Sequence, residues 1–131
     1  MLQRLENLEE NIATLNTFKQ KFTIEDVKTN KIDEWSLRYG IFESIQIVID
    51  IACHLSNRYN LGSAKTYTEC IENLLQQNYI DEKLAKSMIS AIELRNLLIY
   101  EYVKIEIEQL YDFLELTDDF SMFIFQVKEY V

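Results

Sequence analysis

Proline is absent from the 131-residue sequence, and glycine occurs only twice, at Gly40 and Gly62. Sandwiches and barrels need many turns built from these two residue types, so an all-β fold is nearly excluded. Glycine-rich phosphate loops are excluded as well, because the two glycines lie far apart. Hydrophobic residues make up 48% of the chain, as in an ordinary folded domain. The composition therefore predicts an all-α chain that forms one domain over residues 1–131.

Long apolar segments are also missing. No apolar run approaches the ~20 residues that cross a bilayer, and the first ten residues lack the apolar core of a signal peptide. Cys53 and Cys70 do not have the C-x-x-C spacing, so we expect reduced thiols in a cytoplasmic protein. With His54 as the only histidine and no Glu-x-x-His pattern, no metal site is predicted. We expect no other cofactor.

Basic side chains are outnumbered, with 13 Lys and Arg against 22 Asp and Glu and a net charge of -9. Proteins that bind nucleic acid usually show a basic balance, because phosphate contacts dominate their affinity. Any RNA site would therefore be a local basic groove within an unfavourable overall field. The acidic excess also suits a basic protein partner, or it serves solubility alone.

Apolar residues recur every three or four positions, which predicts four or five antiparallel helices packed as a bundle. The expected helices cover about residues 2–22, 33–59, 66–75, 81–98 and 110–127. Asp81 is expected to cap the helix that follows it, and Gly62 lies in the clearest turn, where it can adopt a positive φ. Capping-box spacing occurs at Thr23 with Asp26 and at Thr66 with Glu69.

The segment Ile41–Leu55 is apolar on almost every side. Such a helix is either buried at the centre of a bundle or also faces a partner subunit. Together with Phe120, Phe123 and Phe125, this apolar excess suggests a dimer. On the same helix, Asp50 and His54 lie four residues apart and can hydrogen-bond. That pair would be either a polar pair inside the bundle or dimer, or a catalytic pair.

Arg95 interrupts the apolar face of the fourth predicted helix. A guanidinium there is unfavourable unless it meets a carboxylate, a phosphate or a carbonyl. Tyr102 nearly aligns with Arg95 two turns along, whereas Tyr100 is about 140° off that line. Either the helix ends near Ile99, or a symmetry mate completes a site that contains both residues. The alternative is a structural salt bridge of Arg95 beside two packing tyrosines.

Residues 94–102, Leu-Arg-Asn-Leu-Leu-Ile-Tyr-Glu-Tyr, resemble the signature of HepT-like toxins of the HEPN ribonuclease superfamily. That motif is Arg, four residues, His, any residue and Tyr, usually with Asn after the Arg. Segments 49–54, 61–62, 66–70 and 79–80 follow the family's order and spacing, so the resemblance covers about residues 35–115. It implies a HEPN-like helical bundle that forms a two-fold homodimer, in which two motifs face one cleft.

The resemblance also implies the toxin of a toxin–antitoxin system, a metal-independent ribonuclease acting on RNA, with tRNA as one candidate substrate. Arg95 and Asn96 take the RNA-binding positions, with Arg95 also in the catalytic set. Asp50 is a weaker catalytic candidate near the cleft. The implied partner is a minimal nucleotidyltransferase antitoxin, which neutralises the toxin by AMPylation of Tyr102.

One position departs from the motif, because Tyr100 replaces the histidine. Phenols titrate near pH 10, so they donate a proton to phosphate but accept one poorly at neutral pH. Losing a positioned acid–base group typically costs about 10²–10⁴-fold in rate, so we predict weak or lost ribonuclease activity. Rescue would need His54 to reach the same cleft. The alternatives are a non-catalytic binding or regulatory subunit of a minimal nucleotidyltransferase, or a plain helical interaction module.

Overall fold

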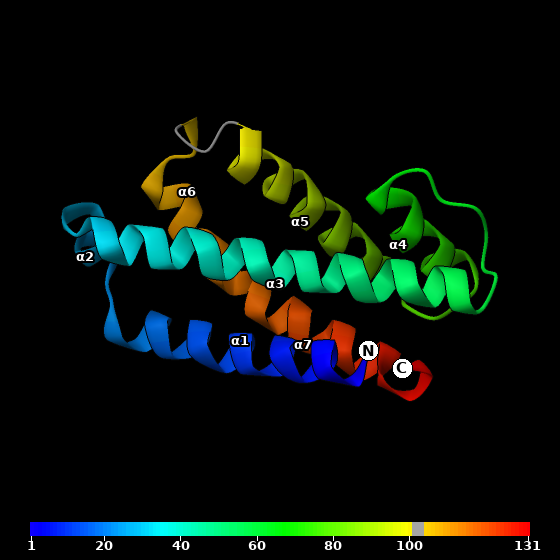
Figure 1. The fold of residues 1–131 in the computed structure, drawn as a ribbon. Coiled ribbons are helices and arrows are strands. Elements are labelled where there is room, and N and C mark those ends of the chain that lie inside the picture. Colours follow the sequence, from blue (N-terminus) through cyan, green and yellow to red (C-terminus); the bar gives the residue numbers. More distant parts are fainter. Residues whose placement is uncertain (101–103) are drawn as a thin grey trace.

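The computed structural model describes residues 1–100 and 104–131, and these residues contain helices and no strand. Figure 1 shows α1 and α5 running in one direction and α3 and α7 in the opposite one, as expected for an antiparallel bundle. The all-α prediction is confirmed. The helices are α1 (Leu2–Lys21), α2 (Ile24–Thr29), α3 (Lys31–Arg58), α4 (Tyr67–Gln76), α5 (Glu82–Tyr100), α6 (Ile107–Asp112) and α7 (Leu116–Val127), with short 3₁₀ turns at Phe113–Glu115 and Lys128–Tyr130.

Helix α3 occupies the centre of the bundle and contacts every other α-helix named above. Its apolar residues between Ile41 and Leu55 are almost all buried against these neighbours, which confirms the prediction of a central helix. Phe120 and Phe123 are buried too, and only Phe125 remains 67% exposed. One chain therefore buries most of this apolar surface, and the dimer stays a prediction.

Capping side chains set several helix starts. The predicted capping box at the start of α2 is complete, with Thr23 and Asp26 exchanging both hydrogen bonds. Asp81 accepts a 2.8 Å bond from the backbone N–H of Leu84, as predicted. This bond, together with one from Gln126, holds the pKa of the Asp81 carboxyl below its ordinary value.

The predicted helix over 110–127 is divided, with a 3₁₀ turn at Phe113–Glu115 between α6 and α7. The hydroxyl of Thr117 donates to the carbonyl of Leu114 at 3.0 Å, just past this turn. The turn changes the direction of the chain between α6 and α7. Leu114, before α7, and Phe120, within α7, are both buried. No proline or glycine marks the break, which is why the sequence did not show it.

The connection between α3 and α4 folds back through a fixed turn. Gly62 has φ +147°, as its predicted role requires, and a Cβ there would lie 2.9 Å from Oδ1 of Asn73. The buried amide of Asn73 donates to the hydroxyl of Ser56 at 3.0 Å and to the carbonyl of Ser63 at 3.4 Å. Asn73 thus ties the turn to both helices.

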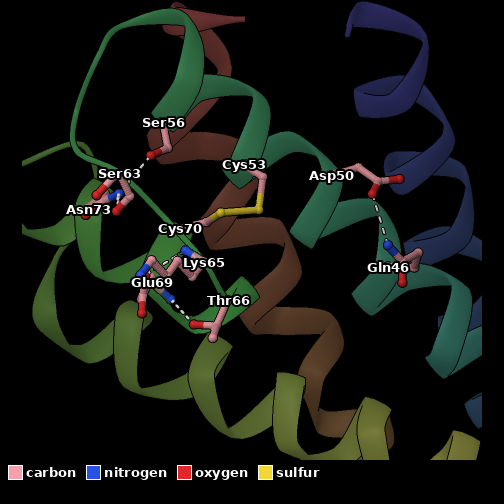
Figure 2. The surroundings of a disulfide bond; sticks show 10 residues. All are labelled: Gln46, Asp50, Cys53, Ser56, Ser63, Lys65, Thr66, Glu69, Cys70 and Asn73. Carbon is pink, nitrogen blue, oxygen red and sulfur yellow. Dashed lines mark hydrogen bonds between the residues drawn. A yellow bond between two sulfur atoms is a disulfide. The ribbon is translucent and has the colours of Figure 1, made fainter.

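Cys53 on α3 and Cys70 on α4 form a disulfide, shown in Figure 2. The expectation of reduced thiols was wrong. The turn brings the two Cα atoms to 5.0 Å, inside the range that a disulfide spans, although the cysteines are 17 positions apart in the chain. A search for closely spaced cysteines cannot detect this pairing, because the fold creates it.

No helix in the described ranges combines the length and the apolarity needed to cross a membrane.

Candidate functional site

Arg95 lies in the C-terminal half of α5, where its guanidinium is half-buried against α3 and α4. Its Nε donates to Oε1 of Gln46 at 2.9 Å, and its Nη1 donates to Oδ1 of Asn96 at 3.0 Å. The guanidinium carbon also lies over two aromatic rings, 5.6 Å from the centroid of Phe42 and 5.2 Å from that of Tyr67. Amide carbonyls and rings therefore hold this cation in place.

The alternative of a structural salt bridge is wrong for the part of the chain that the structure describes. No ion pair of Arg95 occurs among residues 1–100 and 104–131. Neutral amides orient a guanidinium without cancelling its charge. The positive charge of Arg95 thus remains available to an anion, although the chain as a whole carries -9.

Asp50 is linked to Arg95 indirectly, because both side chains hydrogen-bond to Gln46. Its Oδ1 accepts from Nε2 of Gln46 at 3.0 Å, and its Oδ2 pairs with Nη1 of Arg4 at 2.6 Å. Figure 2 shows the bond between Gln46 and Asp50 along α3. Among the described residues these bonds replace the expected Asp50–His54 pair, which was wrong. Because Asp50 fixes the amide nitrogen of Gln46, the amide oxygen is turned toward Arg95.

Tyr100 is the last residue of α5 that the structure describes, so a helix end near Ile99 and a site completed by a symmetry mate both stay predictions. Its side chain is 78% exposed, so it does not pack as the structural alternative required. Because five helical positions rotate the chain by about 500°, Tyr100 and Arg95 face different directions within one protomer. Asn96 is exposed beside Arg95, and Tyr102 falls outside the described residues.

Sequence reasoning missed three neighbours of Arg95: Phe42, Gln46 and Tyr67. Gln46 gave one usable signal, because it is a polar residue within the apolar segment of α3 and lies one turn before Asp50. Tyr67 is the first residue of α4, directly after the capping Thr66. Nothing in the sequence places it beside a residue of α5.

An exposed apolar face runs along α3 and α5 toward Arg95. Trp35 and Tyr39 on α3 are 58% and 62% exposed, and Leu98 and Ile99 line the same hollow of about 460 Å³ from α5. Phe42 also lines this hollow, and its ring centroid is 5.6 Å from the guanidinium carbon of Arg95. We call these residues the α3–α5 face. Soluble proteins rarely leave a contiguous apolar patch uncovered unless it meets a partner.

Metal-ligating side chains do not gather in the described ranges, where no group of three His, Cys, Asp or Glu residues could hold an ion.

Residues 8–126 match the sequence profile of the family described as ribonuclease HepT-like. The chain belongs to this family. The resemblance inferred from residues 94–102 is thereby confirmed, and the family match extends well beyond that motif at both ends.

Comparisons with individual proteins agree with the assignment to the HepT-like family. The mRNA nuclease HepT of Shewanella oneidensis is 25% identical over 112 residues, which cover 85% of this chain and 77% of that protein. The tri-AMPylated HEPN toxin of Shewanella oneidensis, solved in complex with its MNT antitoxin, superposes with a TM-score of 0.74 at 22% identity, over 93% of this chain and 96% of that one. YutE of Bacillus subtilis, a cytosolic protein of unknown function, gives a TM-score of 0.83 at 16% identity, over 98% and 85% of the two chains. These superpositions show a shared HEPN-type helical fold.

Proposed function

We propose that this HepT-like chain is the toxin of a toxin–antitoxin pair and has the machinery of a metal-independent ribonuclease. The observation that carries the proposal is the guanidinium of Arg95, at the arginine position of the family motif, which is held by amide oxygens and forms no ion pair among residues 1–100 and 104–131. Family membership and the name of the nuclease relative support it. We further propose that residues 1–131 form one domain with this function.

Arg95 and the adjacent Asn96 are proposed to bind the scissile phosphate of RNA. Gln46, held by Asp50, keeps the guanidinium oriented before the substrate arrives, so Asp50 acts as a positioning residue. Metal-free cleavage also requires one group that takes the proton of the 2′-hydroxyl and another that protonates the leaving 5′-oxygen. Tyr100, at the motif histidine position, can donate a proton but accepts one poorly, so the activity is expected to be weak or lost.

Replacing Tyr100→His tests this interpretation directly. With tRNA as substrate and EDTA present, the variant should cleave about 10²–10⁴-fold faster than the parent, because imidazole both accepts and donates protons near pH 7. Adding Arg95→Gln to the Tyr100→His variant is the matched control and should abolish the gain.

Cleavage by the parent at the rate of the Tyr100→His variant would contradict the acid–base argument. Cleavage by neither protein would favour the second candidate function, a non-catalytic binding or regulatory subunit of a minimal nucleotidyltransferase. The observation that favours this second candidate is Tyr100 itself, which lacks the acid–base capacity of the motif histidine.

A two-fold homodimer is the second element of the proposal. Since Arg95 and Tyr100 diverge within one protomer, a second copy would bring its own Tyr100 toward the first copy's Arg95. The α3–α5 face is the surface that such a pairing would cover, because it is apolar and reaches Arg95. Light scattering at micromolar concentration should find a dimer, and Trp35→Glu should convert it to monomer. A monomeric parent would contradict the shared cleft.

The third element is neutralisation by a minimal nucleotidyltransferase antitoxin through AMPylation of Tyr102. Its support is the family motif and the tri-AMPylated toxin among the structural relatives. Added phosphate charge close to Arg95 would repel the phosphates of RNA, which gives neutralisation a physical cause. Incubation with the neighbouring nucleotidyltransferase and ATP should add the mass of one or more AMP units, and Tyr102→Phe should lose the adduct. An adduct that persists in that variant would refute Tyr102 as the acceptor.

We place the protein in the cytoplasm, where RNA and a nucleotidyltransferase would meet it. The cytosolic relative YutE supports this location. The Cys53–Cys70 disulfide argues against it, because cytosolic reductants normally keep thiols reduced. Thiol alkylation of the protein in freshly lysed cells, followed by intact mass measurement, would count the modified cysteines. Two alkylated cysteines indicate a reducing compartment.

A further inference from the structure

We propose that Tyr67 is a stacking platform for a nucleobase of single-stranded RNA, next to the phosphate that Arg95 holds. This inference rests on the proposed ribonuclease function and names the part of the substrate that a second side chain would bind. It assigns to α4 a direct role in RNA binding that the family motif on α5 does not include.

The first support is the placement of the Tyr67 ring. The guanidinium carbon of Arg95 lies 5.2 Å from the ring centroid, and 43% of the Tyr67 surface is still exposed. An RNA nucleotide carries its phosphate and its base close together. A cation and an exposed aromatic ring side by side can therefore contact both parts of one nucleotide.

The second support is that the backbone under Tyr67 is fixed. Thr66 caps α4 by accepting from the N–H of Glu69 at 3.2 Å, and the Glu69 carboxylate accepts from the N–H of Lys65 at 2.7 Å. This differs from the predicted capping box, in which Glu69 would accept from Thr66 itself. One turn along α4, the disulfide at Cys70 holds the helix against α3, as Figure 2 shows. A ring on a fixed support loses little conformational freedom when it binds a base.

The third support is a hollow beside the ring. It measures about 190 Å³ and is lined by Asn57, Gly62, Lys65 and Thr66 as well as Tyr67. Lys65 is exposed, and among residues 1–100 and 104–131 no ion pair involves it. The hollow thus offers amide, hydroxyl and ammonium groups to a base edge or to the next phosphate.

The chain contains a matched control elsewhere. Nζ of Lys128 lies 5.2 Å from the ring centroid of Phe125, which is 67% exposed. This pair reproduces an exposed ring with a cation over it, but it belongs to α7 and the turn that follows, away from the Arg95 motif. If removal of any exposed aromatic ring weakened RNA binding, replacing Phe125 would weaken it as much as replacing Tyr67. Base stacking at the proposed site depends on Tyr67 alone.

The test is binding of a fluorescein-labelled single-stranded RNA oligonucleotide, measured by anisotropy with the native Tyr100 in place and EDTA present. Tyr67→Leu should weaken binding by about 5- to 150-fold, the range of base–aromatic stacking. Tyr67→Phe should bind like the parent, since the ring is retained, and so should Phe125→Leu. Thermal unfolding followed by circular dichroism checks that each variant is folded.

The dependence of binding on salt separates stacking from mere positioning of Arg95. For single strands, the slope of log affinity against log salt falls by about 0.7 for each phosphate that the protein no longer neutralises. Arg95→Gln should lower that slope, whereas Tyr67→Leu should weaken binding at an unchanged slope. A reduced slope in Tyr67→Leu would overturn the stacking role, because the ring would then only be holding Arg95.

Two further outcomes keep this inference distinct from the proposed function. If Tyr67→Leu binds like the parent while Arg95→Gln binds weakly, the stacking role is refuted and the phosphate site stands. If the parent binds no RNA at all, both proposals fall.

Discussion

Two arginines approach the same stretch of α3 from different helices and end in different environments. Arg4 on α1 pairs with the carboxylate of Asp50 at 2.6 Å. Arg95 on α5 donates instead to the amide oxygen of Gln46, one turn earlier on α3. The nitrogen of that same amide is bound to Asp50. The same series of hydrogen bonds thus connects Arg4, which is paired with a carboxylate, to Arg95, which is bound by a neutral amide.

The difference between these arginines shows that residue type alone does not make a binding site. Arg4 is already satisfied by an anion, so its charge has little to offer a phosphate. Arg95 has amides and rings as partners, which fix its position at no cost to its charge. Because Arg4 neutralises Asp50, that carboxylate does not weaken the positive potential around Arg95.

The largest expected effect is on the stability of the fold. It concerns how α4, beside Arg95, and α1, which carries Arg4, are each attached to α3. The Arg95 side includes α4, which a disulfide ties to α3, whereas α1 packs on α3 without a covalent link. Reduction should lower the free energy of unfolding by about 3 kcal/mol, as expected for closing a loop of this length. Chemical denaturation with and without dithiothreitol measures the change, with a Cys53→Ser, Cys70→Ser double variant as the control.

Hydrogen exchange locates that effect. On reduction, the amides of α4 should lose protection while those of α1 keep theirs. Equal loss in both helices would contradict the distinction between a covalently held region and a packed one.

The second prediction compares the two arginines by RNA binding. Arg95→Gln should weaken binding to single-stranded RNA by about 10- to 100-fold, because a charge-assisted hydrogen bond to phosphate is removed. Arg4→Gln should leave the salt dependence of binding unchanged, since Arg4 does not touch a phosphate in the proposed complex. Equal decreases of affinity and of salt slope in the two variants would remove the difference on which the site rests.

The smallest effect is expected at the Arg4–Asp50 ion pair itself. Its side chains are 49% and 30% exposed, so a double-mutant cycle of Arg4→Gln and Asp50→Asn should give a coupling of about 0–1 kcal/mol in unfolding. Urea denaturation of the four proteins provides the measurement. A coupling well above this range would mean that the pair acts as a structural clamp for α1.

Local signals account for what the sequence could predict. The box at Thr23 and Asp26 and the cap at Asp81 depend on residues three positions apart, and both formed as expected. The apolar periodicity of α3 predicted a central helix, since burial on every side leaves no other place for it. The family resemblance located Arg95 and identified Tyr100 as a departure.

Contacts between residues that are far apart in the sequence account for what the sequence could not predict. Gln46 is 49 positions from Arg95, and Tyr67 reaches the same guanidinium from a third helix. The disulfide depends on how the turn at Gly62 folds α4 onto α3, which no cysteine spacing reveals. Apolar content could not decide between a buried central helix and a dimer for a related reason: the sequence shows how many apolar residues there are but not how completely one chain can bury them.

Trp35 is an intrinsic fluorescent probe of the α3–α5 face. It is the only tryptophan in the chain, and 58% of its surface is open to solvent. Indole emission depends on the polarity of its surroundings, so the fluorescence of the whole protein reports on this one patch. A dilution series followed at a single wavelength would therefore register the covering of the face, with no background from other indoles.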